Sequence, residues 1–327
     1  MSERGLGGVP EAPTPRGRSV GRVLALIVLA GAVACDRTEA PGAAATRDAA
    51  PATAPSSGAG LLVFERRVGG NLDLYTVPAG GGIERRLTDD PADDSLPRWT
   101  PDGRAIVFTS NRTGNWQLWE MPAGGGAARR LRVNAAREWQ VDPSRDGRSL
   151  AFLSNLDGPE SLWVLDRATG RARMLVRHGP RSILGNPSFS PDGGRIAFSS
   201  NWWMGHHIYV WDSATQQATR ISSLTQGGCG PRFAPDGRAV IYVARRHLGG
   251  TSRIVEHDLQ TGNEKVLVAW PALNYDPVVS PDGSEIAFAS NITGQYEIYR
   301  QRIADGKAWR VTYGQGPARG PDYEPGR

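Results

Sequence analysis

The stretch that decides the fold is residues 187–201, PSFSPDGGRIAFSSN, because its pattern recurs along the chain. The turn motif at its centre appears as TPDG at 100–103, SRDG at 144–147, SPDG at 190–193, APDG at 234–237 and SPDG at 280–283. The aspartates of successive motifs are separated by 44 or 46 residues. A repeat of this length predicts a propeller, a solenoid or another array of similar units.

Each repeat has the composition of short strands. An apolar cluster of a few residues follows every motif, and Gly, Asn or Asp bounds each cluster, which favours strands over helices. Proline, aspartate and glycine in the motif suit a tight turn between two such strands. An aromatic residue stands six positions after each aspartate, and we expect this column to form a core between the repeats: Phe108, Phe152, Phe198, Tyr242 and Phe288. Four short strands in about 45 residues predict one propeller blade.

The two ends of the repeat region supply the number of blades. Residues 61–64 (LLVF) align with 105–108 (AIVF), so the first blade lacks its first strand at the N-terminal end. Residues 321–325 (PDYEP) repeat the pattern of 231–235 (PRFAP) and supply that strand at the C-terminal end. We therefore predict an all-β, six-bladed β-propeller over residues 61–327, with four-stranded blades and the first blade closed by the C-terminal strand. Such closure removes free sheet edges.

The N-terminal region has the features of an export signal. Residues 23–34 (VLALIVLAGAVA) are apolar and follow Arg16, Arg18 and Arg22. Twelve residues are too few to span a bilayer but suit a signal peptide, which we place at residues 1–34. Small residues precede Cys35, as in a lipoprotein signal, so we predict lipidation at Cys35. Plain secretion with cleavage after Ala34 is the alternative.

Residues 35–60 are rich in Ala, Pro, Thr, Ser and Gly and contain no large apolar residue. This composition predicts a disordered tether between the lipid anchor and the propeller. We therefore expect an exported, lipid-anchored protein of a bacterial cell envelope, on its periplasmic side or at the cell surface. The formal net charge of +5 comes without any dense run of Lys and Arg, so we expect no nucleic-acid partner.

The repeat pattern P-x-[FW]-S-P-D-G-x-x-[IL]-[AV]-F-x-S-N resembles that of the TolB-type propellers and covers essentially all of residues 61–327. Arg145 replaces the proline in one copy, and Ala244 and Arg245 replace Ser-Asn in another. The resemblance implies a propeller that binds a protein partner. TolB carries an additional N-terminal α/β domain, for which we expect no counterpart here, so a role in the Tol–Pal machinery does not follow. Similar repeats occur in prolyl-oligopeptidase-like enzymes and in oligogalacturonate lyases.

Candidate binding residues lie where the copies differ. The first strand of each blade runs along the central channel, so the residues before its proline are expected at the channel mouth. Acidic and amide side chains occur there in four copies: Asp94, Glu138, Asn186, Asn274 and Asp276. They suit a cation or the basic end of a peptide, through charge-assisted hydrogen bonds. A solvated funnel is the alternative.

The segment NWWMGHH at 201–207 is the most unusual loop of the repeats. Trp202, Trp203 and His206 would form a contact patch, since aromatic residues dominate binding hot spots. The tryptophans would equally stack on a sugar ring, or fold down as a local plug. Trp139 and Tyr275 lie near the predicted mouth and would extend the same surface.

The chain contains no HExxH, GxSxG or Walker motif. We therefore predict no catalytic residues, no metal and no cofactor. The sequence favours a monomeric, non-catalytic protein that recognises an envelope protein or peptide through the channel mouth. A glycan-binding protein or an oligosaccharide lyase that uses the same face is the alternative, and a mainly structural role is a third.

Overall fold

The computed structural model describes residues 60–326, except 178, 180, 203–204, 224–226 and 246–249. The predicted signal peptide, Cys35 and all of the predicted tether except Gly60 lie outside this part of the chain. Every regular element within it is a strand. Nowhere among these described residues is there a helix with the length and apolar character needed to cross a membrane.

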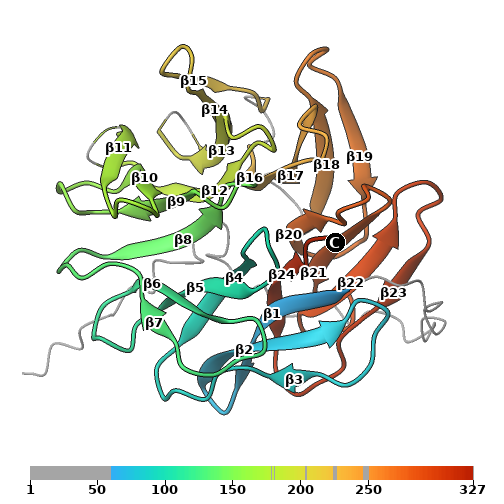
Figure 1. The fold of residues 1–327 in the computed structure, drawn as a ribbon. Helices are drawn as coiled ribbons and strands as arrows, with labels where there is room; N and C mark the ends of the chain where they lie inside the picture. Colours follow the sequence, from blue (N-terminus) through green and yellow to red (C-terminus); the bar gives the residue numbers. More distant parts are fainter. Residues whose placement is uncertain are drawn as a thin grey trace, which may run out of the picture.

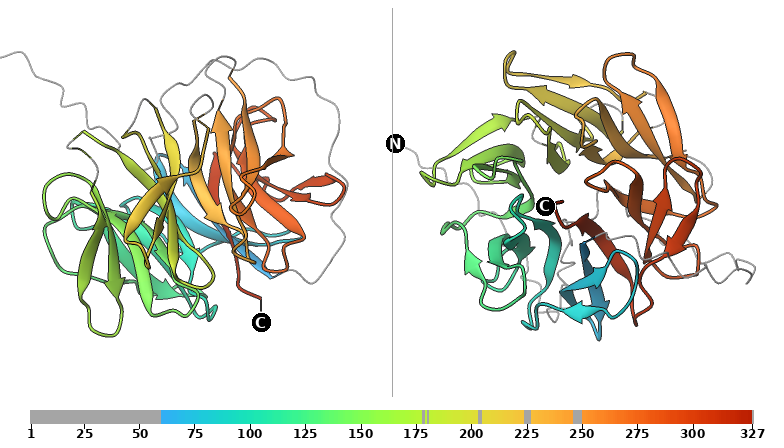
Figure 2. Two further views of the ribbon diagram at one scale, coloured as in Figure 1. Left: turned by 90° about the horizontal axis from the view of Figure 1, so that it is seen from above. Right: turned by 45° about the vertical axis from the view of Figure 1, so that its right-hand side comes forward.

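The strands form six four-stranded antiparallel sheets that stand as blades around a central channel (Figures 1 and 2). Each blade packs against the next, and the sixth packs against the first. The innermost strands of blades one to six are β24 (Ala318–Tyr323), β4 (Asp94–Trp99), β8 (Glu138–Pro143), β12 (Leu184–Phe189), β16 (Cys229–Phe233) and β20 (Asn274–Val279). The predicted all-β, six-bladed propeller is confirmed.

The other three strands of each blade follow outward in chain order. The second strands are β1 (Leu61–Val68), β5 (Ala105–Ser110), β9 (Ser149–Ser154), β13 (Arg195–Ser200), β17 (Ala239–Arg245) and β21 (Glu285–Ser290). The third strands are β2 (Asn71–Pro78), β6 (Gln117–Pro122), β10 (Ser161–Asp166), β14 (His207–Asp212), β18 (Ser252–Asp258) and β22 (Glu297–Arg302). The outermost strands are β3 (Arg85–Arg86), β7 (Arg129–Arg130), β11 (Ala172–Val176), β15 (Gln217–Arg220), β19 (Glu264–Val268) and β23 (Ala308–Arg310).

Because successive strands alternate in direction, the connections fall on two faces. The turns that join first to second strands, and third to fourth strands, lie on one face, which we call the turn face. The loops that join second to third strands, and one blade to the next, lie on the other. We call this second face the mouth face, because the innermost strands begin there.

The repeated motif forms the turn between the first two strands. In blade four, the Ser190 hydroxyl donates to the Asp192 carboxylate, which also accepts the Gly194 N–H at 3.0 Å. These bonds hold the pKa of Asp192 below its usual value. Gly193 has φ +72°, the left-handed conformation that a glycine adopts without steric cost. The aromatic column six residues after each aspartate is buried throughout, as predicted.

The C-terminal strand closes the first blade. β24 pairs antiparallel with β1, with Leu62 opposite Tyr323 and Arg66 opposite Ala318. The Glu324 N–H donates to the Leu61 carbonyl at 2.8 Å, and the Leu61 N–H donates to the Glu324 carboxylate at 3.0 Å. The ring is therefore sealed by the two ends of the described chain.

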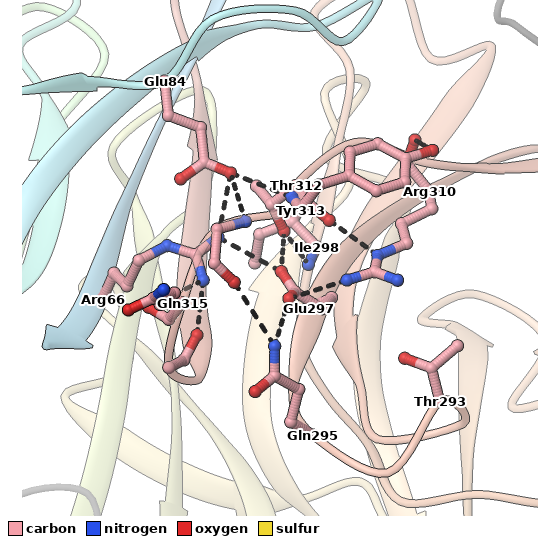
Figure 3. A network of polar contacts seen from close by, with 12 residues as sticks. Arg66, Glu84, Thr293, Gln295, Glu297, Ile298, Arg310, Thr312, Tyr313 and Gln315 are labelled. Carbon is pink, nitrogen blue, oxygen red and sulfur yellow. Dashed lines mark hydrogen bonds and ion pairs between the residues drawn. The ribbon is translucent and has the colours of Figure 1, made fainter.

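A buried ion network reinforces this closure on the mouth-face side (Figure 3). Arg66 of β1 lies 2.9 Å from Glu84 and 3.2 Å from Glu297 of blade six. The Glu297 carboxylate is wholly buried and also pairs with Arg310 at 2.8 Å, while the Thr312 hydroxyl donates to it. Arg66 donates in addition to the Gly316 carbonyl, in the loop that leads into β24. The network thus joins blades six and one.

We expect Glu297→Ala to lower the free energy of unfolding by about 3 kcal/mol, because it leaves the buried Arg66 guanidinium without one of its carboxylates. Urea unfolding followed by tryptophan fluorescence measures the change. Asp305→Ala is the matched control: it removes an exposed carboxylate that pairs with Arg302 at 2.8 Å in the same blade, and we expect a much smaller loss because exposed ion pairs contribute little. Equal losses in the two variants would show that the network does not hold the ring closed.

Candidate functional site: the channel and its mouth

A β-bulge in each innermost strand sets the shape of the channel. The pairing of every first strand with its second strand shifts register near the proline. The residue before that proline, or before Val141 in blade three, has a positive φ in all six blades: Leu96, Gln140, Asn186, Gly230, Asp276 and Gly320, at 50° to 60°. Such a conformation is costly for a residue with a side chain. A bulge changes the direction in which a strand's residues point. Here the residue before the proline and the residue after it both face the channel axis.

The bulge residues line a small pit that opens toward the mouth face. Its volume is about 20 Å³, which is room for about one water molecule. Its polar walls come from Glu65, Gln140, Asn186, Asp276 and Arg319, and the remaining wall is made by Leu96, Cys229, Gly230, Val243 and Tyr275. The candidate residues Asn186, Asp276 and Tyr275 therefore lie together here.

Hydrogen bonds between blades hold the pit in shape. The Glu65 carboxylate accepts the Leu96 N–H at 2.7 Å, and the Gln140 side-chain carbonyl accepts the Asn186 N–H at 2.6 Å. Arg319 pairs with Asp276 at 3.3 Å and lies over the Tyr275 ring, 5.3 Å from its centroid. Burial raises the pKa of Glu65, against the opposing effect of its hydrogen bond from Ser95. The pit is thus rigid, and its two carboxylates are balanced by only one arginine.

A second charged layer lies deeper in the channel, toward the turn face. Asp142 pairs with Arg232 at 2.7 Å and lies 3.8 Å from Arg98. The Asp322 carboxylate accepts the Trp99 N–H at 2.9 Å, and the Arg98 charge acts on it. Four blades therefore contribute to one buried cluster of two arginines and two aspartates below the pit.

Burial dominates the titration of this cluster. It raises the pKa of Asp142 to about 7 and that of Asp322 to about 6, although the Arg98 charge lowers both. The folded state therefore binds protons that the unfolded chain releases near pH 4.

Three candidate residues do not face the channel. Asp94, Glu138 and Asn274 are fully buried, so their predicted place on the rim of the mouth was wrong. Asp94 pairs with Arg112 at 2.7 Å, Glu138 accepts a hydrogen bond from Asn134 at 2.9 Å, and Asn274 donates to the Ser252 carbonyl at 3.0 Å. They lie two residues before the bulge and point into the blades, where they anchor the loops of the mouth face.

The tryptophan candidates divide in a similar way. Trp139 is buried in the core between blades three and four, with Arg137 4.2 Å from the centroid of its ring. Trp202 is 55% exposed on the loop between β13 and β14. His206 lies partly buried in the same loop, and Trp203 lies outside the described residues. A fold-down plug therefore does not describe Trp202.

Trp202 belongs to a group of exposed apolar side chains on the mouth face. Among the described residues, nine large hydrophobic side chains are exposed, and six of them lie on mouth-face loops or at a strand end on that face: Val68, Val133, Leu156, Ile183, Trp202 and Tyr313. Ile183 and Trp202 are close, because the Ile183 N–H donates to the side chain of Asn201 at 2.6 Å. Single exposed apolar side chains are ordinary on a protein surface, so the neighbouring pair Ile183 and Trp202 is the candidate binding surface on this face.

Sequence reasoning missed Glu65, Arg319 and the deeper cluster of Arg98, Asp142, Arg232 and Asp322. The sequence did contain a signal for the cluster. Its four residues occupy the same repeat position, directly after the proline of the innermost strand, which Val141 replaces in blade three. That column reads Arg, Asp, Ser, Arg, Val and Asp in blades two to six and then one. Charged residues in an otherwise buried strand position indicate a polar channel. Among the described residues, no three His, Cys, Asp or Glu side chains gather as they would around a metal ion.

We expect the free energy of unfolding to fall as the pH rises from 4 to about 7, because the raised pKa values of Asp142 and Asp322 stabilise the fold only while these groups are protonated. Each proton contributes a slope of up to about 1.4 kcal/mol per pH unit. Asp142→Asn should remove its share of this slope in urea unfolding at several pH values. Asp236→Asn, in an exposed turn, is the control. A slope unchanged in Asp142→Asn would contradict the assignment.

Comparisons with known proteins agree with this architecture. The family model described as TolB beta propeller domain matches residues 27–180 and 161–326. The Tol-Pal system protein TolB of Nitratidesulfovibrio vulgaris is 31% identical over 109 residues, which are 33% of this chain and 24% of that protein. The TolB of Bordetella pertussis is 55% identical over 40 residues, 12% of this chain and 9% of that protein. The matches thus span less than a quarter of these relatives.

Solved structures share the fold at low sequence identity. TolB from Acinetobacter baumannii superposes with a TM-score of 0.71 at 18% identity, covering 82% of this chain and 67% of that one. An oligogalacturonate lyase in complex with manganese superposes with a TM-score of 0.56 at 17% identity, covering 78% and 74%. At these identities the likeness extends to the fold alone. Because the family model matches nearly the whole described chain, the chain belongs to the TolB β-propeller family.

Proposed function

We propose that this propeller binds a protein or peptide partner in a bacterial cell envelope, through its mouth face and without catalysis. The observation that supports this most is the gathering of exposed apolar side chains around the mouth of a polar channel. Interfaces combine such apolar anchors with a polar centre that fixes orientation. Relatives that carry the same repeats are named as Tol-Pal system proteins, which is consistent with a protein partner.

The pit supports a partner with a cationic tip. Two carboxyl groups, Glu65 and Asp276, line the pit together with a single arginine, Arg319, so the pit offers carboxyl oxygens as hydrogen-bond acceptors to a cationic group. Its volume suits one small group rather than a whole side chain, so we place the bulk of the partner on the loops outside. Charge-assisted hydrogen bonds to an ammonium or guanidinium group would fix the partner's orientation.

Trp202 and Ile183 are proposed as the apolar anchors. Trp202→Ala combined with Ile183→Ser should weaken binding to a protein captured by crosslinking in native envelopes by about tenfold or more, since buried aromatic anchors carry much of the binding energy. Pull-down with tagged full-length chain, followed by mass spectrometry and titration, measures the loss.

Val266→Ser is the matched control, because Val266 on β19 is 46% exposed and Ile183 is 45% exposed. It changes an equally exposed side chain on the outer rim. Binding that survives the double substitution, or that falls equally in the control, would refute the mouth-face assignment. A deletion that perturbs the envelope while mouth substitutions do nothing would favour a structural role.

Glycan binding is the second candidate, because an exposed indole such as Trp202 also stacks on sugar rings. It uses the same face and predicts binding without any protein partner. Screening the full chain against envelope-derived and plant-derived oligosaccharides, with assay for cleaved products, separates glycan binding and lyase activity from peptide recognition.

The membrane attachment is also a proposal. Arg16, Arg18 and Arg22 before the apolar residues 23–34, with Cys35 directly after small residues, support export followed by acylation. Metabolic labelling with a radioactive fatty acid should mark the wild-type chain and Cys229→Ser but not Cys35→Ser. An unlabelled wild-type chain would favour plain secretion with cleavage after Ala34.

A further inference from the structure

Both ends of the described chain lie on the turn face. The Gly60 carbonyl accepts the Ala79 N–H at 3.0 Å, where the third strand of blade one turns toward its fourth. The C-terminal strand ends beside the same point, since the Glu324 N–H donates to the Leu61 carbonyl. The end of the chain therefore emerges opposite the mouth (Figure 2).

The turn face carries arginines in one sector, over blades two and three. We call it the basic sector and define it by Arg104, Arg129, Arg145, Arg148, Arg167 and Arg171. Arg145 replaces the proline of the repeated turn, and its exposed guanidinium makes no hydrogen bond or ion pair within the described residues. Across the turns of blades four to six, acidic residues outnumber basic ones: Asp192, Asp212, Asp236, Asp258, Asp282 and Asp305 against Arg195, Arg238, Arg302 and Lys307. In the basic sector, the six arginines outnumber four carboxylates, Asp102, Glu120, Asp146 and Asp166, so the turn face is polarised by a small excess of charge on each side.

A cleft of about 480 Å³ opens between the turns of blades two and three in this sector. Arg145 and Arg167 line it together with Asp102, Glu120 and Asp146. Glu120 is already paired, with both Arg129 and Arg167. Asp102 and Asp146 each accept an N–H of their own turn, at 3.1 and 3.0 Å. The cleft is large enough for a lipid headgroup, and Arg145 lines it without an ion pair inside the described part of the chain, whereas Arg148 lies 4.0 Å from the Asp146 carboxylate.

An exposed apolar side chain stands beside the basic sector. Ile83 is 89% exposed at the end of the glycine-rich turn of blade one. Arg85, two residues later, donates to the Gly124 carbonyl of blade two at 2.8 Å, which places this turn against the next blade. An apolar tip among arginines is the combination that inserts at a membrane interface, because the tip enters the headgroup region while the arginines meet the phosphates.

We infer that the basic sector of the turn face rests on the anionic surface of a phospholipid bilayer, with Ile83 dipping into the headgroup region. This rests on the proposed function in one respect, namely that the N-terminal region holds the chain at a membrane. Because the chain leaves from the turn face, contact needs no reversal of the domain. The acidic blades four to six tilt away from the lipid, and the mouth face points away from the membrane toward an approaching partner.

Hydrogen exchange of the full chain, captured in lipid nanodiscs through its N-terminal region, tests this contact. Backbone amides in the turns 100–104 and 144–148 should exchange about threefold or more slowly in nanodiscs that contain phosphatidylglycerol than in nanodiscs of phosphatidylcholine alone. The difference should vanish in 0.5 M salt, because arginines at a surface are screened. The mouth-face loops 111–115 and 155–158 should exchange equally in both lipids.

Arg145→Ala combined with Arg148→Ala should abolish the lipid-dependent difference, and Ile83→Ser should reduce it. The control for charge is Arg181→Ala combined with Arg253→Ala, which removes two exposed arginines outside the basic sector. The control for the apolar side chain is Val133→Ser, because Val133 is 87% exposed on the mouth face. Equal exchange of the turns in both lipids, or failure of the chain to enter nanodiscs, would overturn the proposal. The Ile83→Ser variant should still capture the protein partner normally. The lipid-contact proposal and the proposal of partner binding through the mouth face can therefore be tested separately.

Discussion

The pairing of β24 with β1 is the constraint on which the rest of the structure depends. A propeller blade gains its stability by packing against two neighbours, and a ring with one unpaired blade would expose a sheet edge. Strand β24 removes that edge by supplying the innermost strand of blade one, and the Arg66–Glu297 network ties blade six to the same joint. This network joins charges that are costly to bury, so its geometry must be complete to be favourable. Closure also fixes the distance of all six innermost strands from the axis, and hence the width of the channel.

The channel follows from that width. Six innermost strands cannot place large apolar side chains on the axis and still pack against one another. The bulge before each proline solves this by turning one residue per blade into the left-handed conformation, at some backbone cost. Polar and apolar side chains both line the channel, and backbone N–H groups of neighbouring blades donate hydrogen bonds to polar ones, as the Leu96 N–H does to Glu65. The residues that recur in every blade therefore form the apolar core, and the residues that differ between blades at the bulge line the channel.

The fold could be read from the sequence because its determinants are local and repeated. Three features can be recognised in the sequence alone: the spacing of the turn motifs, the aromatic column and the displaced strand at residues 321–325. The channel was only partly predictable. A bulge changes which face a residue occupies, so counting back from the proline placed Asp276 and Asn186 correctly but put Asp94 and Glu138 on the wrong face. Asp142 and Arg232 lie 90 residues apart in non-adjacent blades, so their shared repeat position marks both as channel residues but does not show that they pair with each other.

The direction of the strands separates the two faces of the molecule. In an antiparallel four-stranded blade, the tight turns fall on one face and the longer loops, together with the connections between blades, fall on the other. The longer loops vary most, and they carry the exposed Trp202, Ile183 and Leu156. Closure by a C-terminal strand brings both ends of the described chain to the turn face, because β1 begins where β24 ends. In the arrangement that we propose, attachment on the turn face would leave the variable face free. The proposed separation of anchoring from recognition would then follow from ring closure rather than from an additional feature of the fold.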